Sequence, residues 1–393
     1  MKNKVAILGS TGSIGKTCLK IIAKDKKNFD LQLLTAQKNY KLLLKQAKIF
    51  SVKHIIITDK KSYQAAISKN IKNIKIYNNF NQFNKIFPKK LDYVMSAIVG
   101  LDGLIPTINI IKYTKVIAIA NKETIICAWN LIKKKLDIHK TKFIPVDSEH
   151  FSIWYALKNY SNSSINKIFL TASGGSLLNF SKSKLKNVKL SEILNHPNWK
   201  MGKKITVDSS TMMNKVFEII EAKKIFNLNY NQLGILIHPK SYIHSIIKFN
   251  DGMIKIIAHD TTMEIPIFNS IYNDSKKIIN SNPIDIKKLN DLDLSKVNNK
   301  IYPNVRILNY LTNKDSLFET ALVTINDELV DLLLKGKIKY NSIYSRMNKI
   351  LDSKEIKKLK KELPRNVSDV INTHKYVRSK INLAKFNYEK KVF

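Results

Sequence analysis

Cysteine is scarce in this chain, with only Cys18 and Cys127 among 393 residues. A disulfide scaffold is therefore excluded, and the cysteine usage fits a reducing compartment. Long apolar runs are also missing. The best candidate, residues 105–126, is interrupted by three lysines, so no uninterrupted apolar stretch reaches the ~18–20 residues of a membrane span. Met1 stands directly before the first expected strand, so we expect no targeting segment and a cytosolic protein.

Acidic residues are few. The chain has 30 Asp and Glu against 68 Lys and Arg, which gives a formal net charge of +38. Such an excess is typical of proteins that bind nucleic acid or anionic membranes. The lysines are nevertheless spread along the whole chain, and they accompany abundant Ile and Asn and only 11 Gly. We interpret the charge mainly as the compositional drift of an AT-rich genome, although it still favours small anionic substrates such as phosphates.

An apolar strand is expected at residues 5–8, followed at once by a glycine-containing turn at residues 9–15 and then a helix. This is the context of a dinucleotide-binding fingerprint, in which the backbone approaches a pyrophosphate at a helix N-terminus. The spacing is GxxGxxG rather than GxGxxG, so a tight turn without a ligand is the alternative. The next strand, residues 31–36, ends without a carboxylate for a ribose hydroxyl, and Lys38 beside it suits the 2′-phosphate of NADP.

Further strands are expected at residues 54–58, 91–96 and 115–120, alternating with helical stretches. This alternation predicts an α/β fold with a parallel sheet. The last of these strands is followed by Asn121, Lys122 and Glu123. Ligands of such sheets bind beyond the carboxyl ends of the strands, so these side chains are placed for binding. A solvated Lys–Glu pair is the alternative.

Acidic residues gather after an apolar stretch at residues 143–146, where Asp147 and Glu149 would project from the same side of an extended chain. Two such carboxylates repel one another unless a cation or proton lies between them. With Glu218 they would form an all-oxygen set, which prefers Mg²⁺ or Mn²⁺, whereas zinc would favour His150. The alternative is a helix N-terminus with an acidic first turn.

Residues 196–221 combine a loop with a helix. Residues 196–202 have the composition of a mobile loop, residues 205–207 predict a strand, and helical periodicity runs from residue 211 to about 226. On that helix Asn214, Lys215 and Glu218 fall within one arc of ~100°. Ser209 would stand at the helix start, where an anion is favoured. The alternative is an ordinary amphipathic helix with a surface Lys215–Glu218 pair.

A serine with two glycines, Ser173-Gly174-Gly175, follows an expected strand at residues 167–170. Such a loop can hold a phosphate with its backbone N–H groups, and a plain turn is the alternative. Together the motifs resemble the 1-deoxy-D-xylulose 5-phosphate reductoisomerase family, over residues 5–258 with little interruption and more weakly beyond. The resemblance rests on residues 9–15, 96–100, 120–123, 146–150, 171–175, 196–202, 207–215 and 238–245.

The resemblance implies a division of the chain. It comprises a Rossmann-like NADPH-binding domain at residues 1–146, an α+β catalytic domain at 147–285, a linker at 286–300 and a helical domain at 301–393. A lid is implied at residues 196–202. The resemblance also implies a homodimer in the bacterial cytoplasm.

The resemblance further implies roles for individual residues. Thr11, Gly12, Ser13, Ile14, Lys38, Asn39, Asn121, Glu123 and Gly202 match the family's NADPH contacts. Asp147, Glu149 and Glu218 match the three ligands of one Mg²⁺ or Mn²⁺ ion. Lys122, Ser148 and His196 match groups around the substrate's hydroxyls and carbonyl. Ser173, Ser209, Asn214 and Lys215 match the phosphate site, and Trp199 and Met201 match the lid. The catalytic set is Lys122, Asp147, Glu149, His196 and Glu218.

The implied reaction is an NADPH-dependent rearrangement and reduction of 1-deoxy-D-xylulose 5-phosphate to 2-C-methyl-D-erythritol 4-phosphate, by a retro-aldol/aldol step followed by hydride transfer, in isoprenoid precursor biosynthesis. The metal would polarise the hydroxyketone oxygens. Two alternatives remain. Another NADP-dependent two-domain dehydrogenase, of the semialdehyde or homoserine type, would need no three-carboxylate set. A basic nucleic-acid-binding module would need clustered Lys and Arg with interleaved aromatics.

Some positions depart from the family pattern, namely Gln37, residues 176–178, Glu264, Phe151 and residues 154–155. At Glu264 an acid replaces a base. None of these departures removes a metal or phosphate residue. We therefore expect them to affect rate and stability more than the identity of the reaction.

Overall fold

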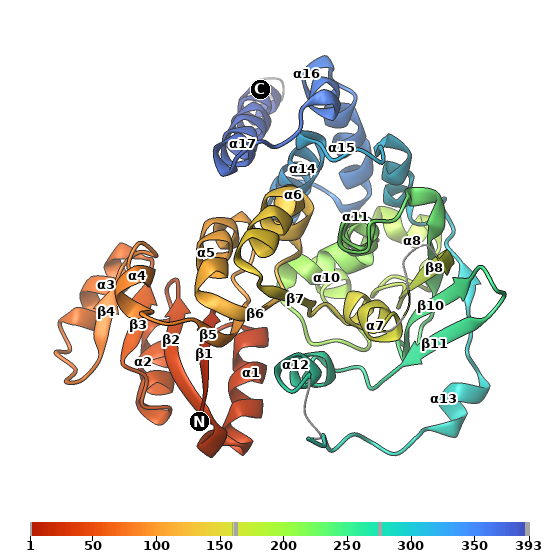
Figure 1. Ribbon diagram of the computed structural model, residues 1–393. Coiled ribbons are helices and arrows are strands. Elements are labelled where there is room, and N and C mark those ends of the chain that lie inside the picture. The colour runs from red at the N-terminus through yellow and green to blue at the C-terminus, as the bar shows by residue number, and fades with distance from the viewer. Residues whose placement is uncertain (1, 159, 161–163, 274–276, 390–393) are drawn as a thin grey trace. The chain divides into compact units, whose positions relative to one another are not determined.

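The computed structural model describes residues 2–158, 160, 164–273 and 277–389 of the chain (Figure 1). The fold is α/β, as predicted. Contacts divide the chain into two compact units, and each is described by itself. The first contains Met1–Thr124, Ile132–Trp154 and Thr262–Ser281, and the second contains Ile125–Leu131, Tyr155–Thr261 and Asn282–Phe393.

The first unit contains a parallel sheet of seven strands in the order β4-β3-β2-β1-β5-β6-β7. The second half of β1 and all but one residue of β3 are fully buried, which explains their continuous apolar sequences. Strand order reverses direction between β1 and β5, and ligands of such sheets bind at this switch point. The strands are β1 (Asn3–Leu8), β2 (Phe29–Ala36), β3 (His54–Ile57), β4 (Lys75–Tyr77), β5 (Leu91–Ser96), β6 (Thr114–Ile119) and β7 (Lys142–Pro145).

Helices follow most of these strands, in agreement with the predicted alternation. They are α1 (Ser13–Lys24), α2 (Tyr40–Ile49), α3 (Lys60–Ile67), α4 (Phe83–Ile86), α5 (Leu104–Ile110), α6 (Lys122–His139) and α7 (Ser148–Ala156), with short 3₁₀ turns between some of them. A later segment, α12 (Glu264–Ile271), packs on α1. There the Glu264 carboxylate lies 2.9 Å from the Lys20 ammonium and 3.0 Å from that of Lys24. The acid at this position therefore has two cationic partners within its own unit.

The second unit contains a five-stranded sheet in the order β11-β10-β8-β9-β12. Strands β8 and β9 are parallel, and the other pairs are antiparallel. The strands are β8 (Ile165–Ala172), β9 (Leu233–Ile237), β10 (Ile243–Phe249), β11 (Ile254–Ala258) and β12 (Ser295–Lys296). The accompanying helices are α8 (Lys182–Lys186), α9 (Leu190–Ile193), α10 (Lys203–Ser210), α11 (Met213–Ile225) and α13 (Ile286–Asn290).

Beyond residue 303 the chain is helical, as the sequence predicts. Its elements are a 3₁₀ segment, η6 (Pro303–Tyr310), and the helices α14 (Leu317–Leu334), α15 (Ile343–Leu351), α16 (Lys354–Lys358) and α17 (Val367–Glu389). Helix α14 is buried along most of its length and contacts α10, α15 and α17. It begins with a capping box, in which Ser316 and Glu319 satisfy each other's backbone N–H groups.

The predicted strand at residues 205–207 is wrong, because these residues lie within α10. Their β-branched side chains favour a strand locally, but α10 packs against α11 and α14, and tertiary contacts override the local preference. Residues 286–300 contain α13 and the short strand β12, which pairs with β9. The domain boundaries remain predictions. In the described part of the chain, every helix is too short or too polar to cross a membrane.

Candidate active site

The turn after β1 has the geometry of a backbone-lined site. Gly9 has a φ of +85°, and a Cβ there would lie 2.6 Å from the Ala97 carbonyl oxygen. At Gly15 a Cβ would meet the Gly9 carbonyl oxygen at 2.4 Å, so both positions require glycine. Helix α1 begins after Gly12 without a side-chain cap, and Gly12 and Ser13 are exposed. The predicted pyrophosphate residues Thr11, Gly12, Ser13 and Ile14 thus border an uncapped helix N-terminus, which favours an anion.

Lys38 and Asn39 are exposed at the carboxyl end of β2. The Asn39 side chain caps α2 by accepting a hydrogen bond from the Leu42 N–H at 3.2 Å. The sequence reasoning missed Asp59, a carboxylate after β3 whose pKa is lowered mainly by hydrogen bonds from Ser62, with a smaller contribution from the Lys38 charge. Its carboxylate caps α3, accepting the Ser62 N–H at 2.9 Å. A cation and an acid therefore stand near each other where the 2′-phosphate is predicted.

Asn121 has a structural role at the end of β6. Its carboxamide oxygen accepts the Thr124 N–H at 2.8 Å, and its Nδ2 donates to the carbonyl oxygens of Ile98 and Gly100, the latter at 2.7 Å. Asn121 thereby caps α6 and holds the turn after β5. Glu123, in the first turn of α6, is buried.

Asp147, Ser148 and Glu149 lie where β7 leads into α7. The extended conformation expected through residue 149 is wrong, because α7 begins at Ser148 and Glu149 lies in its first turn. The alternative of an acidic first turn therefore describes the local backbone. The Lys122 ammonium lies 3.0 Å from an Asp147 oxygen, and the Ser148 hydroxyl donates to Glu149 at 2.5 Å. The catalytic residues predicted for the first unit thus lie together.

The second unit brings the glycine loop and the start of the lid together. The Ser173 hydroxyl accepts the Gly175 N–H at 3.0 Å and lies 3.1 Å from His196 Nε2. A Cβ on Gly175, whose φ is +68°, would lie 2.8 Å from the Ser210 Cα. The loop therefore packs tightly against the end of α10, which carries Ser209. Burial lowers the pKa of His196, so its imidazole is neutral near pH 7.

Residues 197–202 are fixed at several points. His196 Nδ1 accepts the Trp199 N–H at 3.0 Å, and the Asn198 carboxamide donates to the Ser241 hydroxyl at 2.8 Å. The Trp199 ring packs edge-on against His244, with 6.4 Å between the ring centroids. Gly202 is the N-cap of α10 and has open space around its Cα. Met201 is partly buried.

Ser209 does not stand at the start of the second helix, because it lies in the last turn of α10 and α11 begins at Met213. Met212, with a φ of +64°, makes the break between the two helices. The predicted convergence on α11 is confirmed, since Asn214 Nδ2 and the Lys215 ammonium both contact the Glu218 carboxylate. Lys215 is only 4% exposed and Glu218 only 1%, so the surface-pair alternative is wrong.

Several supporting residues escaped the sequence reasoning because their partners are distant in the chain. The Tyr302 hydroxyl donates to the Gly174 carbonyl at 2.7 Å, and the Tyr340 hydroxyl donates to the Ser210 carbonyl at 2.6 Å. Asn326 donates to the buried Asp208 carboxylate at 2.7 Å. The helical C-terminal region therefore stabilises both segments that carry the predicted phosphate residues.

The residues present fit a hard divalent cation in chemical type. The predicted ligands are carboxylates, which Mg²⁺ and Mn²⁺ prefer. In the first unit Asp147 faces the Lys122 ammonium, and in the second Glu218 faces that of Lys215. Each carboxylate thus lies in a position that already attracts positive charge.

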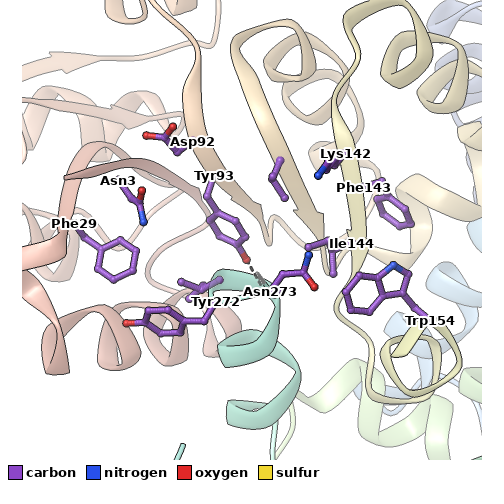
Figure 2. A pocket seen from close by; sticks show the side chains of 13 residues that line it. Asn3, Phe29, Asp92, Tyr93, Lys142, Phe143, Ile144, Trp154, Tyr272 and Asn273 are labelled. Atoms are coloured by element: carbon purple, nitrogen blue, oxygen red, sulfur yellow. Dashed lines mark hydrogen bonds between the residues drawn. The ribbon is translucent and has the colours of Figure 1, made fainter. Parts of the chain in front are cut away.

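A cavity of about 580 Å³ lies away from these residues, at the amino-terminal edge of the parallel sheet (Figure 2). Figure 2 shows the Tyr93 ring at its centre, between Phe29 and Tyr272 on one side and Trp154 on the other. The Tyr93 hydroxyl lies 2.7 Å from that of Ser270. None of the predicted site residues lines this cavity.

Comparisons with known proteins cover most of the chain. Residues 5–129 match the family model for 1-deoxy-D-xylulose 5-phosphate reductoisomerase, and residues 143–226 and 260–380 match models for C-terminal domains of that enzyme. The 1-deoxy-D-xylulose 5-phosphate reductoisomerase of Pelagibacter ubique is 57% identical over 383 residues, covering 96% of this chain and 98% of that protein. The enzyme of Thermodesulfovibrio yellowstonii is 36% identical, covering 90% and 93%.

Solved structures of reductoisomerases have a similar fold over nearly the whole chain. The reductoisomerase of Zymomonas mobilis in complex with NADPH has a TM-score of 0.85 at 27% identity, covering 96% of this chain and 97% of that chain. A DOX-P reductoisomerase in complex with NADPH, fosmidomycin and magnesium has a TM-score of 0.88 at 31% identity, covering 99% of both chains.

Proposed function

The chain belongs to the 1-deoxy-D-xylulose 5-phosphate reductoisomerase family, and on that premise we propose that it converts 1-deoxy-D-xylulose 5-phosphate to 2-C-methyl-D-erythritol 4-phosphate. NADPH supplies the hydride, and a bound Mg²⁺ or Mn²⁺ supplies Lewis-acid polarisation of the substrate oxygens. A match over nearly the whole chain replaces the alternatives of another dehydrogenase class or a nucleic-acid-binding module.

We assign the metal to Asp147 and Glu149 of the first unit and Glu218 of the second. The assignment is supported by the family's pattern and by the acidic donor set. Lys122, whose ammonium lies 3.0 Å from Asp147, is placed to orient a substrate hydroxyl next to these carboxylates. Ser148 donates to Glu149 and thereby fixes the orientation of that carboxylate.

The phosphate site is assigned to Ser173, Ser209, Asn214 and Lys215, all of the second unit. The single observation that carries the proposal is the burial of Lys215 on a helix face shared with Glu218. A buried ammonium needs an anionic partner, and at this position it can serve both Glu218 and a phosphate. Because the phosphate does not react, its binding energy is available to close the lid and order the reacting end.

His196 connects the phosphate loop of the second unit with the lid. It contacts Ser173 of the phosphate loop through Nε2 and the backbone of Trp199 through Nδ1. A ligand that hydrogen-bonds to the Ser173 hydroxyl would therefore change the contact between Ser173 and the His196 ring, and the same ring holds the backbone of Trp199. We assign His196 to the substrate and Trp199 to the cover that excludes water from the site.

We further propose a homodimer in the bacterial cytoplasm. Strand β11 is an edge of its sheet, and its side chains Ile254 and Ile256 are 56% and 46% exposed. An exposed apolar edge strand favours pairing with a second copy across a two-fold axis. Sedimentation should show a dimer that Ile256→Lys converts to a monomer. A monomeric wild type would exclude the dimer.

The proposed location rests on the cysteines. Both cysteines are free and buried, which suits a reducing cytoplasm. Recovery of the protein in a membrane or periplasmic fraction would contradict that location.

Fosmidomycin, which is bound in a solved structure of a relative, offers a direct test. Its affinity should be measured calorimetrically with NADPH and Mg²⁺ for wild type, Glu218→Gln and Lys215→Ala. We expect tight binding by wild type and weakening by at least about tenfold, ~1.4 kcal/mol, in each variant. Lys223→Ala, which changes a lysine on the same helix that pairs with Asp315, is the matched control. Equal affinity in all four proteins would refute the site.

A further inference from the structure

Tyr302 connects the helical C-terminal region with the loop that carries Ser173. Its side chain is only 3% exposed and belongs to the same buried apolar cluster as Ala172, at the end of β8, and Met212, at the break between α10 and α11. Its hydroxyl donates to the Gly174 carbonyl oxygen at 2.7 Å. Tyr302 is therefore packed beside both segments that carry the predicted phosphate residues.

The hydrogen bond from Tyr302 fixes a peptide unit that has little restraint of its own. That unit joins Gly174 and Gly175, whose φ angles are +86° and +68°, and glycine adopts alternative backbone angles more readily than other residues. A trans peptide is planar, so its carbonyl and N–H groups point in opposite directions. A donor on the Gly174 carbonyl therefore also sets the direction of the Gly175 N–H, which donates to the Ser173 hydroxyl oxygen at 3.0 Å.

The His196 ring contacts the same hydroxyl oxygen, and its other nitrogen shows which atom carries the hydrogen. Nδ1 accepts the backbone N–H groups of Asn198 at 3.2 Å and Trp199 at 3.0 Å, so Nδ1 carries no hydrogen. The hydrogen of the neutral ring is therefore on Nε2, which lies 3.1 Å from the Ser173 hydroxyl oxygen and donates to it.

These contacts give the Ser173 hydroxyl a defined polarity. Its oxygen has two acceptor lone pairs, and they receive the Gly175 N–H and the His196 Nε2–H. Neither contact uses the hydrogen of the hydroxyl. The Ser173 side chain is partly exposed, so a ligand can approach it. Because the accepted hydrogen bonds polarise the hydroxyl and strengthen the bond that it donates, Ser173 is suited to donate to an anion.

We propose that Tyr302 is a positioning residue for phosphate binding. Its hydroxyl orients the peptide between Gly174 and Gly175. That peptide and His196 together occupy both lone pairs of Ser173, so that the Ser173 hydrogen donates to a phosphate oxygen. Tyr302 thus acts through the loop and not by contact with the ligand. The identity of the anion as the substrate's phosphate rests on the proposed function, whereas the direction of each hydrogen bond is a property of the chain alone.

A double-mutant cycle tests whether Tyr302 acts through Ser173. Inorganic phosphate is titrated calorimetrically into the full chain, without NADPH or substrate, for wild type, Tyr302→Phe, Ser173→Ala and the double variant. We expect Tyr302→Phe, which keeps the ring and removes the donor, to weaken phosphate binding about three- to tenfold, the effect of one neutral hydrogen bond. In the Ser173→Ala background the same change should cost less than about twofold, because the group that it orients is gone. Equal losses in both backgrounds, no loss in either, or a wild type that does not bind phosphate overturns the proposal.

Tyr310→Phe is the matched control. Tyr310 ends the 3₁₀ segment η6, which Tyr302 precedes, and its hydroxyl lies 2.6 Å from the Asn348 carboxamide oxygen and 3.2 Å from the Asp352 carboxylate. This variant also loses a tyrosine hydroxyl from the helical region, but it leaves the Gly174 carbonyl with its donor. Phosphate affinity should therefore match that of wild type. A loss equal to that of Tyr302→Phe would make the role of Tyr302 purely structural and overturn the proposal.

The hydrogen on the His196 ring has its own readout. Nitrogen NMR distinguishes a protonated ring nitrogen from a bare one, and comparison with His196→Gln identifies the signals of this ring. We expect a hydrogen on Nε2 and a bare Nδ1 in the free wild-type protein in neutral solution. A hydrogen on Nδ1 overturns the proposed direction of the hydrogen bonds. Neither measurement uses turnover, so a chain that fails to act on 1-deoxy-D-xylulose 5-phosphate would refute the proposed function and leave both tests intact.

Discussion

The cofactor turn of the first unit and the phosphate region of the second bind anions by different means. Around Gly12 the site consists of backbone at an uncapped helix N-terminus, and Gly12 and Ser13 are exposed. Around Lys215 the site consists of buried charged side chains that contact one another. Tyrosines from the C-terminal region donate to the nearby backbone carbonyls of Gly174 and Ser210. A backbone site depends on the space that glycine leaves free, whereas a side-chain site depends on the identity of each charged group. The following predictions test this difference.

The largest effect is expected at Glu218. Glu218→Gln keeps the shape of the side chain but removes the negative charge, and we expect kcat/KM to fall by more than ~10³-fold. NADPH affinity, measured by fluorescence titration, should stay within about threefold, because the cofactor turn belongs to the other unit. If the Glu218→Gln variant turns over near the wild-type rate in the presence of a chelator, Glu218 is not a metal ligand.

Gly12→Val tests the backbone site. The added side chain has room in the folded protein, since a Cβ at Gly12 would meet only the Gly9 oxygen at 3.4 Å. It would occupy the space of the pyrophosphate, so NADPH affinity should fall about a hundredfold, ~2.7 kcal/mol, with little change in Tm. Thr11→Val, the adjacent side-chain change, should cost only about two- to tenfold. If the two variants bind NADPH equally well, the turn does not hold the pyrophosphate through its backbone.

Lys215→Ala tests the side-chain site. We expect kcat/KM to fall roughly ten- to a hundredfold or more, at ~1.4 kcal/mol per decade, because the phosphate loses a charge-assisted partner. The unpaired Glu218 would also lower the thermal stability. Lys223 lies on the same helix as Lys215 and pairs with Asp315, so Lys223→Ala is the control for stability alone. A loss of activity no greater than in the control would contradict the phosphate assignment.

The smallest effect concerns Lys38. We expect wild type to prefer NADPH over NADH by about tenfold or more, and Lys38→Gln to reduce that preference about tenfold, since a phosphate contact by lysine contributes ~1.5–3 kcal/mol. Lys45→Gln, an exposed lysine on α2, should leave the preference unchanged. Equal kcat/KM for the two cofactors in wild type would refute the assignment.

The sequence predicts elements whose cause is local. The strand at residues 31–36 follows from its apolar residues Leu31, Leu33 and Leu34, and the helix at residues 317–334 follows from its helical period. It also predicts the convergence of Asn214, Lys215 and Glu218, because helix geometry fixes their spacing. The burial of Lys215 and Glu218 was not predictable, because it depends on segments that are distant in the sequence.

The failures have tertiary causes. Residues 205–207 are β-branched, yet α10 forms because it packs against α11 and α14. The partners of Glu264 come from α1, more than two hundred positions earlier, so no local pattern reveals them. The Tyr302 and Tyr340 hydrogen bonds to the phosphate segments likewise depend on contacts between remote parts of the chain.

The most direct test of the whole account is oxidation of NADPH by the purified protein when 1-deoxy-D-xylulose 5-phosphate is added, followed by absorbance with Mg²⁺ and with a chelator. We predict oxidation that requires both substrate and metal and yields 2-C-methyl-D-erythritol 4-phosphate. Absence of oxidation with folded protein, NADPH, substrate and Mg²⁺ all present, or oxidation at the same rate in chelator, would contradict the assignment of the reaction to this chain.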